Sequence, residues 1–176
     1  MRSWMAMAVA GGLLAGCAGQ NSAWGDSYVV KLDPGFSADQ QELALAALKS
    51  WQDAQPMNFE VRIERCDTAA NGEICVRATT ADAVGAWAAA NAVSYLVVAY
   101  TEPRVNGGTV YMPTDLNCSP SYLQETFAHE IGHAMGLQHE VATEDHPLLM
   151  NLQEDARQAA KPQQGDVDQW LRIRNR

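Results

Sequence analysis

Three histidines and a glutamate fall in one short segment of this 176-residue chain. His129, Glu130, His133, Gly136 and His139 follow the spacing H-E-x-x-H-x-x-G-x-x-H. Residues four apart lie on one face of a helix, so His129 and His133 would direct their imidazoles to the same point. Two imidazole nitrogens placed in this way can bind one tetrahedral metal ion at about 2.0–2.1 Å. The spacing therefore predicts a metal centre that holds one zinc ion.

Gly136 predicts the end of that helix, because glycine readily adopts the left-handed conformation that redirects the chain. The reversal would bring His139 back as the third ligand. Three histidines leave the fourth zinc position for water, as in catalytic sites. Glu130 adjoins His129 and can accept a proton from that water, whose pKa zinc lowers toward about 7. These residues predict peptide-bond hydrolysis with Glu130 as the general base.

Other interpretations of the segment stay open. A zinc site that only stabilises the fold would have a fourth protein ligand and would give Glu130 no task. A non-catalytic zinc-binding lipoprotein that acts as a scaffold or binding module of the cell envelope would also bind zinc, as would a peptidoglycan amidase. Metal content measured together with cleavage of an unfolded protein and of muropeptides separates these alternatives.

The motif resembles that of the metzincin metallopeptidases. That family has a methionine turn beneath the zinc, and Leu148-Leu149-Met150-Asn151 is the matching segment here, with Met150 as the methionine. The chain is most similar to a minimal bacterial matrixin-type domain, which implies a catalytic zinc and a protein or peptide substrate. Two departures stand out. The residue after the third histidine is Glu140 rather than the usual serine, and no acidic loop has convincing calcium-ligand spacing, so calcium use stays open.

The resemblance also implies an α+β fold. A twisted mixed sheet and two helices would form an upper lobe, and a small irregular lower lobe would carry a C-terminal helix. The substrate cleft would lie between the lobes. The strand near 109–112 would be the sheet edge along which an extended peptide pairs. Residues 129–133 and the segment after Met150 would bound the S1′ pocket.

Periodicity along the chain predicts the elements that position these residues. Apolar residues between 44 and 51 repeat at helical spacing and follow an S-x-x-Q capping-box pattern, while Ser119 and Pro120 mark the start of the motif helix. The predicted helices are 38–53, 82–92, 120–135 and 166–174, and the predicted strands are 28–32, 58–66, 73–79, 94–100 and 109–112. Residues 102–108 are predicted to form a loop, and 140–163 to be irregular.

The first residues have the pattern of a secretory signal. Their apolar run has about 12 residues, whereas a membrane-spanning helix needs roughly 20. Leu14-Ala15-Gly16-Cys17 resembles the lipobox of bacterial lipoproteins, whose cysteine is lipidated and becomes the new N-terminus. We expect a signal peptide over 1–16, a lipidated tether over 17–27 and a catalytic domain over 28–176. The expected location is the cell envelope, on an outer membrane; an ordinary signal peptide with an incidental cysteine is the alternative.

Three cysteines remain after Cys17, in a compartment that permits disulfides. Cys66 and Cys75 share the polar face of neighbouring predicted strands joined by an Asn-Gly turn, which predicts a disulfide between them. Cys118 is then a partly buried free thiol or a thiolate that reaches the metal. His146 is a partly exposed loop residue, a group beside the substrate or a substitute metal ligand.

Composition limits the partners of the chain. The formal net charge is −9, with 12 basic and 21 acidic residues, and the isoelectric point is about 4.7. Nucleic acids and polybasic-type membrane contacts both require clustered Lys and Arg, so these acidic values argue against them. Hydrophobic residues make up 47% of the chain, which suits one packed domain, and we expect a monomer.

Overall fold

The computed structural model describes residues 27–93, 97–143, 146–151 and 159–175. Its strands are β1 (Ser27–Leu32), β2 (Asn58–Ile63), β3 (Glu73–Thr79), β4 (Tyr100–Arg104) and β5 (Gly107–Pro113). Its helices are α1 (Ala38–Ala54), α2 (Ala81–Ala90), α3 (Pro120–Ala134) and α4 (Gln164–Arg174). Among these described residues, no helix is long and apolar enough to cross a membrane. The predicted lipidation site, Cys17, lies outside the described residues.

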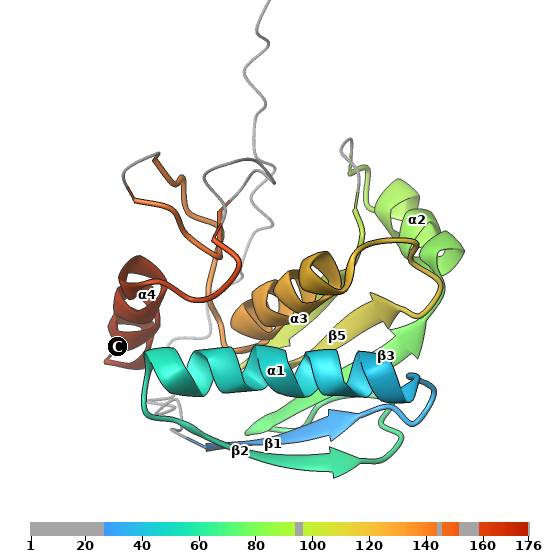
Figure 1. Ribbon diagram of the computed structural model, residues 1–176, viewed down its shortest axis with the longest axis horizontal. Coiled ribbons are helices and arrows are strands. Elements are labelled where there is room, and N and C mark those ends of the chain that lie inside the picture. Colours follow the sequence, from blue (N-terminus) through green and yellow to red (C-terminus); the bar gives the residue numbers. More distant parts are fainter. Residues whose placement is uncertain (1–26, 94–96, 144–145, 152–158, 176) are drawn as a thin grey trace, which may run out of the picture.

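The strands form one mixed sheet in the order β2-β1-β3-β5-β4. Four strands run parallel, and β4 pairs antiparallel with β5. Helices α1 and α3 lie side by side over one face of the sheet, and α4 lies away from the sheet near the C-terminal end of α3 (Figure 1). The α+β prediction is confirmed, and the mixed five-stranded sheet with four helices among the described residues is consistent with a metzincin-like fold.

Helix α1 provides the support for α3. It begins with a capping box, in which Ser37 and Gln40 bond reciprocally to each other's backbone N–H groups at 3.2 and 3.0 Å. Its buried row ends in Trp51, whose indole N–H donates to the backbone oxygen of Ala128 on α3 at 2.9 Å. This bond and the surrounding apolar contacts fix the helix that carries the histidine motif.

The prediction that residues 109–112 form the sheet edge is wrong. Strand β5 pairs with β3 on one side and with β4 on the other, so β4 is the edge strand. Residues 102–104, predicted as a loop, belong to β4. Of the strand predicted over 94–100, residues 97–99 precede β4 and are not part of it, and residues 94–96 lie outside the described residues. Strand β4 escaped prediction because its sequence, Tyr-Thr-Glu-Pro-Arg, lacks the apolar alternation of a half-buried strand. Proline is tolerated there because an edge strand does not need every backbone N–H.

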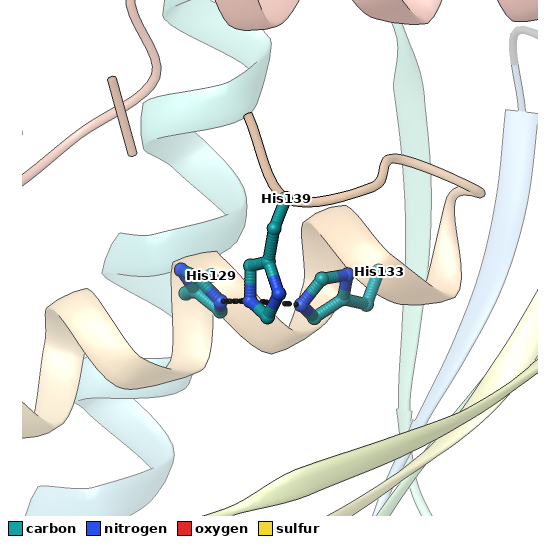
Figure 2. A group of neighbouring side chains, drawn as sticks. All are labelled: His129, His133 and His139. Atoms are coloured by element: carbon teal, nitrogen blue, oxygen red, sulfur yellow. Dashed lines mark hydrogen bonds between the residues drawn. The ribbon is translucent and has the colours of Figure 1, made fainter. Parts of the chain in front are cut away.

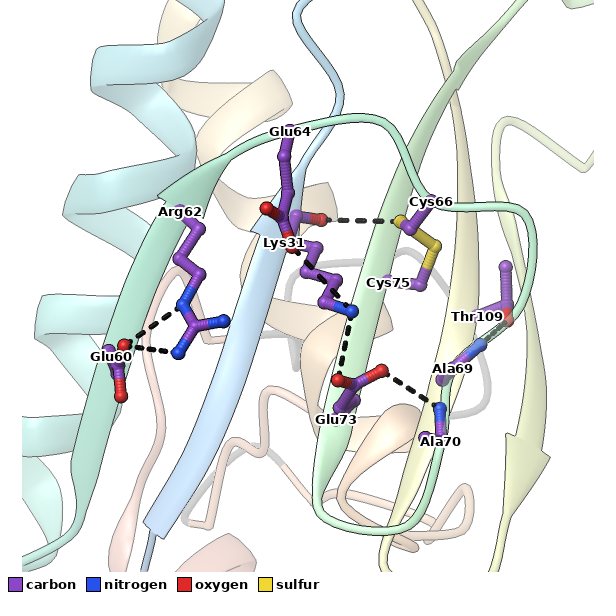
Figure 3. A network of polar contacts seen from close by, with 10 residues as sticks. All are labelled: Lys31, Glu60, Arg62, Glu64, Cys66, Ala69, Ala70, Glu73, Cys75 and Thr109. Atoms are coloured by element: carbon purple, nitrogen blue, oxygen red, sulfur yellow. Dashed lines mark hydrogen bonds and ion pairs between the residues drawn. A yellow bond between two sulfur atoms is a disulfide. The ribbon is translucent and has the colours of Figure 1, made fainter.

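The opposite face of the sheet carries a polar network and a disulfide (Figure 3). Cys66 and Cys75 are bonded to each other, although Cys66 lies in the loop after β2 rather than on the predicted strand. Such a short disulfide loop contributes roughly 3 kcal/mol to the free energy of unfolding. Lys31 on β1 lies between two carboxylates, 2.9 Å from Glu73 and 3.6 Å from Glu64. Ion pairs and a disulfide therefore connect the strands and the loop on this face.

Candidate active site

Three imidazoles converge at the C-terminal end of α3. Serine and proline at positions 119 and 120 start the helix as predicted, and its apolar row packs into the core, so the histidine face points away from the sheet. The Nε2 atom of His139 lies 3.0 Å from the Nε2 atoms of both His129 and His133 (Figure 2). One nitrogen from each ring falls within 4.8 Å of the others. The structure thus brings together the three histidines that the spacing selected.

Gly136 lies where the chain leaves the helix. Its φ of 95° is in the left-handed region, where glycine carries no steric penalty. The N–H groups of Gly136 and Leu137 then bond back to the carbonyls of His133 and Gly132 at 2.9 and 3.0 Å. These bonds end the helix and turn the chain so that His139 returns over α3.

Backbone carbonyls set the tautomers of the two helical histidines. Nδ1 of His129 lies 2.8 Å from the Leu149 oxygen, and Nδ1 of His133 lies 2.9 Å from the Leu137 oxygen. A carbonyl oxygen only accepts, so each Nδ1 must carry the proton. The Nε2 atoms of both rings consequently present lone pairs toward His139. Hydrogen bonds of this kind orient metal-binding histidines and raise their basicity as ligands.

The three imidazoles are held neutral. The pKa values of His133 and His139 are lowered to about 4, chiefly by burial and then by a neighbouring imidazole. The pKa of His129 is also lowered, chiefly by burial and then by His133. Neutral imidazole is the form that binds a metal.

This donor set fits zinc. At most one of the two short Nε2···Nε2 contacts can be a hydrogen bond, because His139 has one Nε2 proton to give and the other two rings have none. A tetrahedral zinc ion holds its ligand nitrogens about 3.3 Å apart, close to the 3.0 Å observed. In the described residues no carboxylate or thiol joins the three imidazoles in this cluster. The described residues therefore offer zinc three imidazole ligands, one fewer than its tetrahedral coordination holds.

Glu130 is buried beside the histidines, with 7% of its surface exposed. Its Oε2 atom accepts a hydrogen bond from the Thr101 hydroxyl on β4 at 2.6 Å. A buried carboxylate requires such partners, because desolvation of a charge is costly. No pattern in the sequence predicts this contact, because Thr101 lies 29 positions before Glu130.

Met150 lies fully buried under α3. Its Sδ atom would lie 2.5 Å from a Cβ atom placed on Gly132, so the methionine is in direct contact with the helix between two of the histidines. The buried Asp166 of α4 accepts hydrogen bonds from the backbone N–H groups of Leu149 and Met150, both at 3.0 Å. Sequence reasoning missed Asp166, since a lone aspartate at the start of a short helix resembles an ordinary cap.

Gln169 of α4 fixes the chain next to the third histidine. Its amide accepts from the Gln138 N–H at 2.6 Å and donates to the Gln138 oxygen at 2.9 Å. On the other side of His139, Glu140 donates its backbone N–H to the Met150 oxygen at 2.9 Å. The glutamine also escaped prediction, because nothing in a single sequence pairs a residue on α4 with a loop 31 positions away.

Two other candidate residues lie outside the cluster. Cys118 is a free, partly exposed thiol that packs against the main core, and burial raises its pKa. Among the described residues it does not belong to the metal-binding group. His146 is exposed, in a loop whose backbone pairs with Thr143.

Comparison with known families agrees with this geometry. The family model described as metallo-peptidase family M12B, reprolysin-like, matches residues 17–169, most of the chain. The chain belongs to this reprolysin-like family. No curated protein matches the chain. Members of this family are metallopeptidases that use zinc, so membership supports zinc-dependent peptidase activity on a protein or peptide substrate.

Proposed function

We propose that the protein is a zinc-dependent endopeptidase in which His129, His133 and His139 hold the metal and Glu130 is the general base. The observation that supports the proposal most directly is that the Nε2 atoms of three neutral imidazoles converge beside the buried carboxylate of Glu130. Family membership supports the same chemistry. The matrixin-type subclass is supported only by the sequence resemblance, since the matching family model is the reprolysin-like one.

Zinc bound by three imidazoles supplies Lewis-acid chemistry, which polarises a carbonyl and lowers the pKa of water. The protein's own groups supply orientation and proton transfer. The Leu149 and Leu137 carbonyls hold the two helical imidazoles in the ligating tautomer. The Glu130 carboxylate takes a proton from the attacking water and delivers it to the nitrogen of the leaving amine, so the carboxylate is regenerated. An extended substrate would pair with the outer edge of β4, the last strand of the described sheet, whose Thr101 contacts Glu130.

The test is a Glu130→Ala variant assayed on unfolded protein and peptide substrates. We expect the variant to keep about one zinc per chain and to lose peptidase activity by at least about 100-fold, since general base catalysis contributes roughly 10²–10⁴-fold. A metal chelator should abolish the wild-type activity. Glu42→Ala, at an exposed position on α1, is the matched control and should cleave at the wild-type rate. Wild-type activity in Glu130→Ala, or a metal-loaded wild type without activity, contradicts the proposal.

The proposed location is the cell envelope, with lipid on Cys17 anchoring a monomeric domain. The pattern over residues 1–17 supports this anchor. Acyl chains bury CH₂ groups at about 0.8 kcal/mol each, so two or more chains hold a protein firmly on a bilayer. The wild type should enter the detergent phase in detergent partitioning and Cys17→Ser should not; equal partitioning of the two would contradict the anchor.

A further inference from the structure

Thr101 on the edge strand β4 makes a side-chain contact with the proposed general base. Its hydroxyl lies 2.6 Å from Oε2 of Glu130 and 3.0 Å from the backbone oxygen of the same residue. The alternation along β4 explains the direction of this side chain. Thr101 pairs with Val110, a fully buried core residue, so both side chains lie on the face that α3 covers.

The hydroxyl has one proton and two possible acceptors. A hydrogen bond to a charged carboxylate is shorter and roughly twice as strong as one to a neutral carbonyl. The two distances agree with this preference, because the carboxylate contact is the shorter by 0.4 Å, the difference between 3.0 and 2.6 Å. The Thr101 hydroxyl therefore donates its hydrogen bond chiefly to Oε2 of Glu130.

The strand that carries Thr101 is held on its other face by stacked rings. Tyr100 lies between Trp87 of α2 and Tyr111 of β5, with ring centroids 3.9 and 4.5 Å apart and nearly parallel planes. The Arg77 guanidinium lies over Tyr111, 5.3 Å from its centroid, and the Tyr111 hydroxyl donates to Glu102 at 3.0 Å. An edge strand lacks a second neighbour, and this stack provides the missing restraint. Thr101 is thus presented to Glu130 from a fixed backbone.

A fixed partner is relevant because the terminal torsion of a glutamate has no sharp rotamer preference. The α3 backbone places the Cα atom of Glu130, but it leaves the plane of the carboxylate undetermined. We infer that Thr101 is a positioning residue, whose hydroxyl orients the Glu130 carboxylate for proton transfer. This inference rests on the proposed function and assigns the Thr101 side chain no contact with the substrate.

Two substitutions separate the hydroxyl from the shape of the side chain. Thr101→Val keeps the β-branched shape and removes the donor, whereas Thr101→Ser keeps the donor and removes a methyl group. In Thr101→Val we expect kcat to fall about tenfold or more, with KM within about twofold and zinc content unchanged, because misplaced catalytic groups lower the rate of the chemical step. Thr101→Ser should recover most of kcat. Thermal unfolding of each variant establishes that the comparison is made between folded proteins.

Thr126→Val is the matched control. This threonine lies on α3 and is also mostly buried, but its hydroxyl donates to the Tyr122 oxygen of its own helix at 2.9 Å. The control should keep the wild-type kcat. If Thr101→Val also keeps the wild-type kcat, or if Thr101→Ser is as impaired as Thr101→Val, the positioning role is wrong.

The Glu130→Ala background distinguishes this failure from failure of the proposed function. With the carboxylate absent, adding Thr101→Val should not lower the residual rate further, because the hydroxyl has no base to orient. An equal fold-loss in both backgrounds would make Thr101 merely structural and overturn the inference while leaving Glu130 as the base. Full activity of Glu130→Ala alone would overturn the proposed function and, with it, the role of Thr101.

Discussion

Each helical imidazole depends on a backbone carbonyl from outside its helix. Leu137 follows the glycine bend and Leu149 lies in the methionine turn, and their oxygens fix the Nδ1 protons of His133 and His129. The H-E-x-x-H spacing places two rings on one face, but it does not select which nitrogen of each ring is free to bind. The spacing therefore selects the ligands, whereas their protonation depends on carbonyls beyond the helix, one four residues from His133 and one 20 residues from His129.

The lowered histidine pKa values predict how acid affects the metal-free protein. In the unfolded chain His133 and His139 take up protons near pH 6.5, whereas in the folded chain they do so near pH 4. Between these values the unfolded state binds more protons, so the stabilisation present above pH 6.5 is lost as the pH falls toward 4. We expect urea denaturation of the chelated protein to give a free energy of unfolding that decreases across this window.

His133→Asn is the comparison for this experiment, since asparagine does not titrate. Its free energy of unfolding should fall less between pH 6.5 and pH 4 than that of the wild type. The difference between the two curves isolates the imidazole from the carboxylates that also titrate in acid. Parallel curves would show that His133 is not held neutral by the fold.

The spacing of residues along the sequence could identify only those site residues that lie on α3 or in the turn that follows it. The three histidines and Glu130 lie within a single helix and its C-terminal turn, so their proximity follows from backbone geometry. Thr101 and Asp166 reach the site from another strand and another helix, and only tertiary packing brings them there. A single sequence has no periodic pattern that would identify residues such as Thr101 and Asp166 as part of the site.

At the scale of elements, α4 holds the part of the site that lies outside α3. Three of its side chains, at helical spacing i, i+3 and i+6, contact that part in turn: Asp166 bonds to the methionine turn, Gln169 to Gln138, and Arg172 to Glu140. The arginine contact is exposed and contributes little. The two buried contacts satisfy backbone groups that would otherwise lose their partners.

Gln169→Leu tests whether α4 positions the third ligand. The substitution keeps the size of the side chain and removes both hydrogen bonds to Gln138, so the segment before His139 loses its restraint. We expect the zinc dissociation constant to rise by about 10-fold or more, the usual effect of losing a group that orients a ligand. Competition with a chromophoric chelator measures this dissociation constant. Gln164→Leu, at an exposed position on the same helix, should bind zinc as the wild type does.

Strand β4 is the element that the sequence pattern predicted least well. The interior strands β1 and β3 each direct apolar side chains into the core, and their predicted ranges differ from the observed ones by at most one residue. Among the described residues β4 has one neighbouring strand, so its residues did not need the alternation that marks a half-buried strand. Hydrophobic patterning gives the least guidance for an edge strand of this kind.

At the scale of the whole molecule, α1, α3 and the methionine turn meet at Gly132, between the two helical histidines. A Cβ atom at this position would lie 2.5 Å from Sδ of Met150 and 3.1 Å from the Trp51 ring. Both neighbours are fully buried, so neither can move without displacing the core. The glycine therefore lets the two helices and the turn pack at the distance that the site requires.

Gly132→Ala and Gly85→Ala form a matched pair that decides between helix propensity and packing. Propensity alone favours alanine in either helix by about 1 kcal/mol. At Gly85 of α2 nothing lies within 4 Å of the added Cβ, so this variant should be more stable by roughly 0.5–1 kcal/mol. At Gly132 overpacking costs about 1–3 kcal/mol and outweighs the propensity, so we expect a less stable protein that binds zinc more weakly. Denaturant unfolding and zinc competition measure both effects, and a Gly132→Ala protein as stable as Gly85→Ala would mean that the three elements do not meet there.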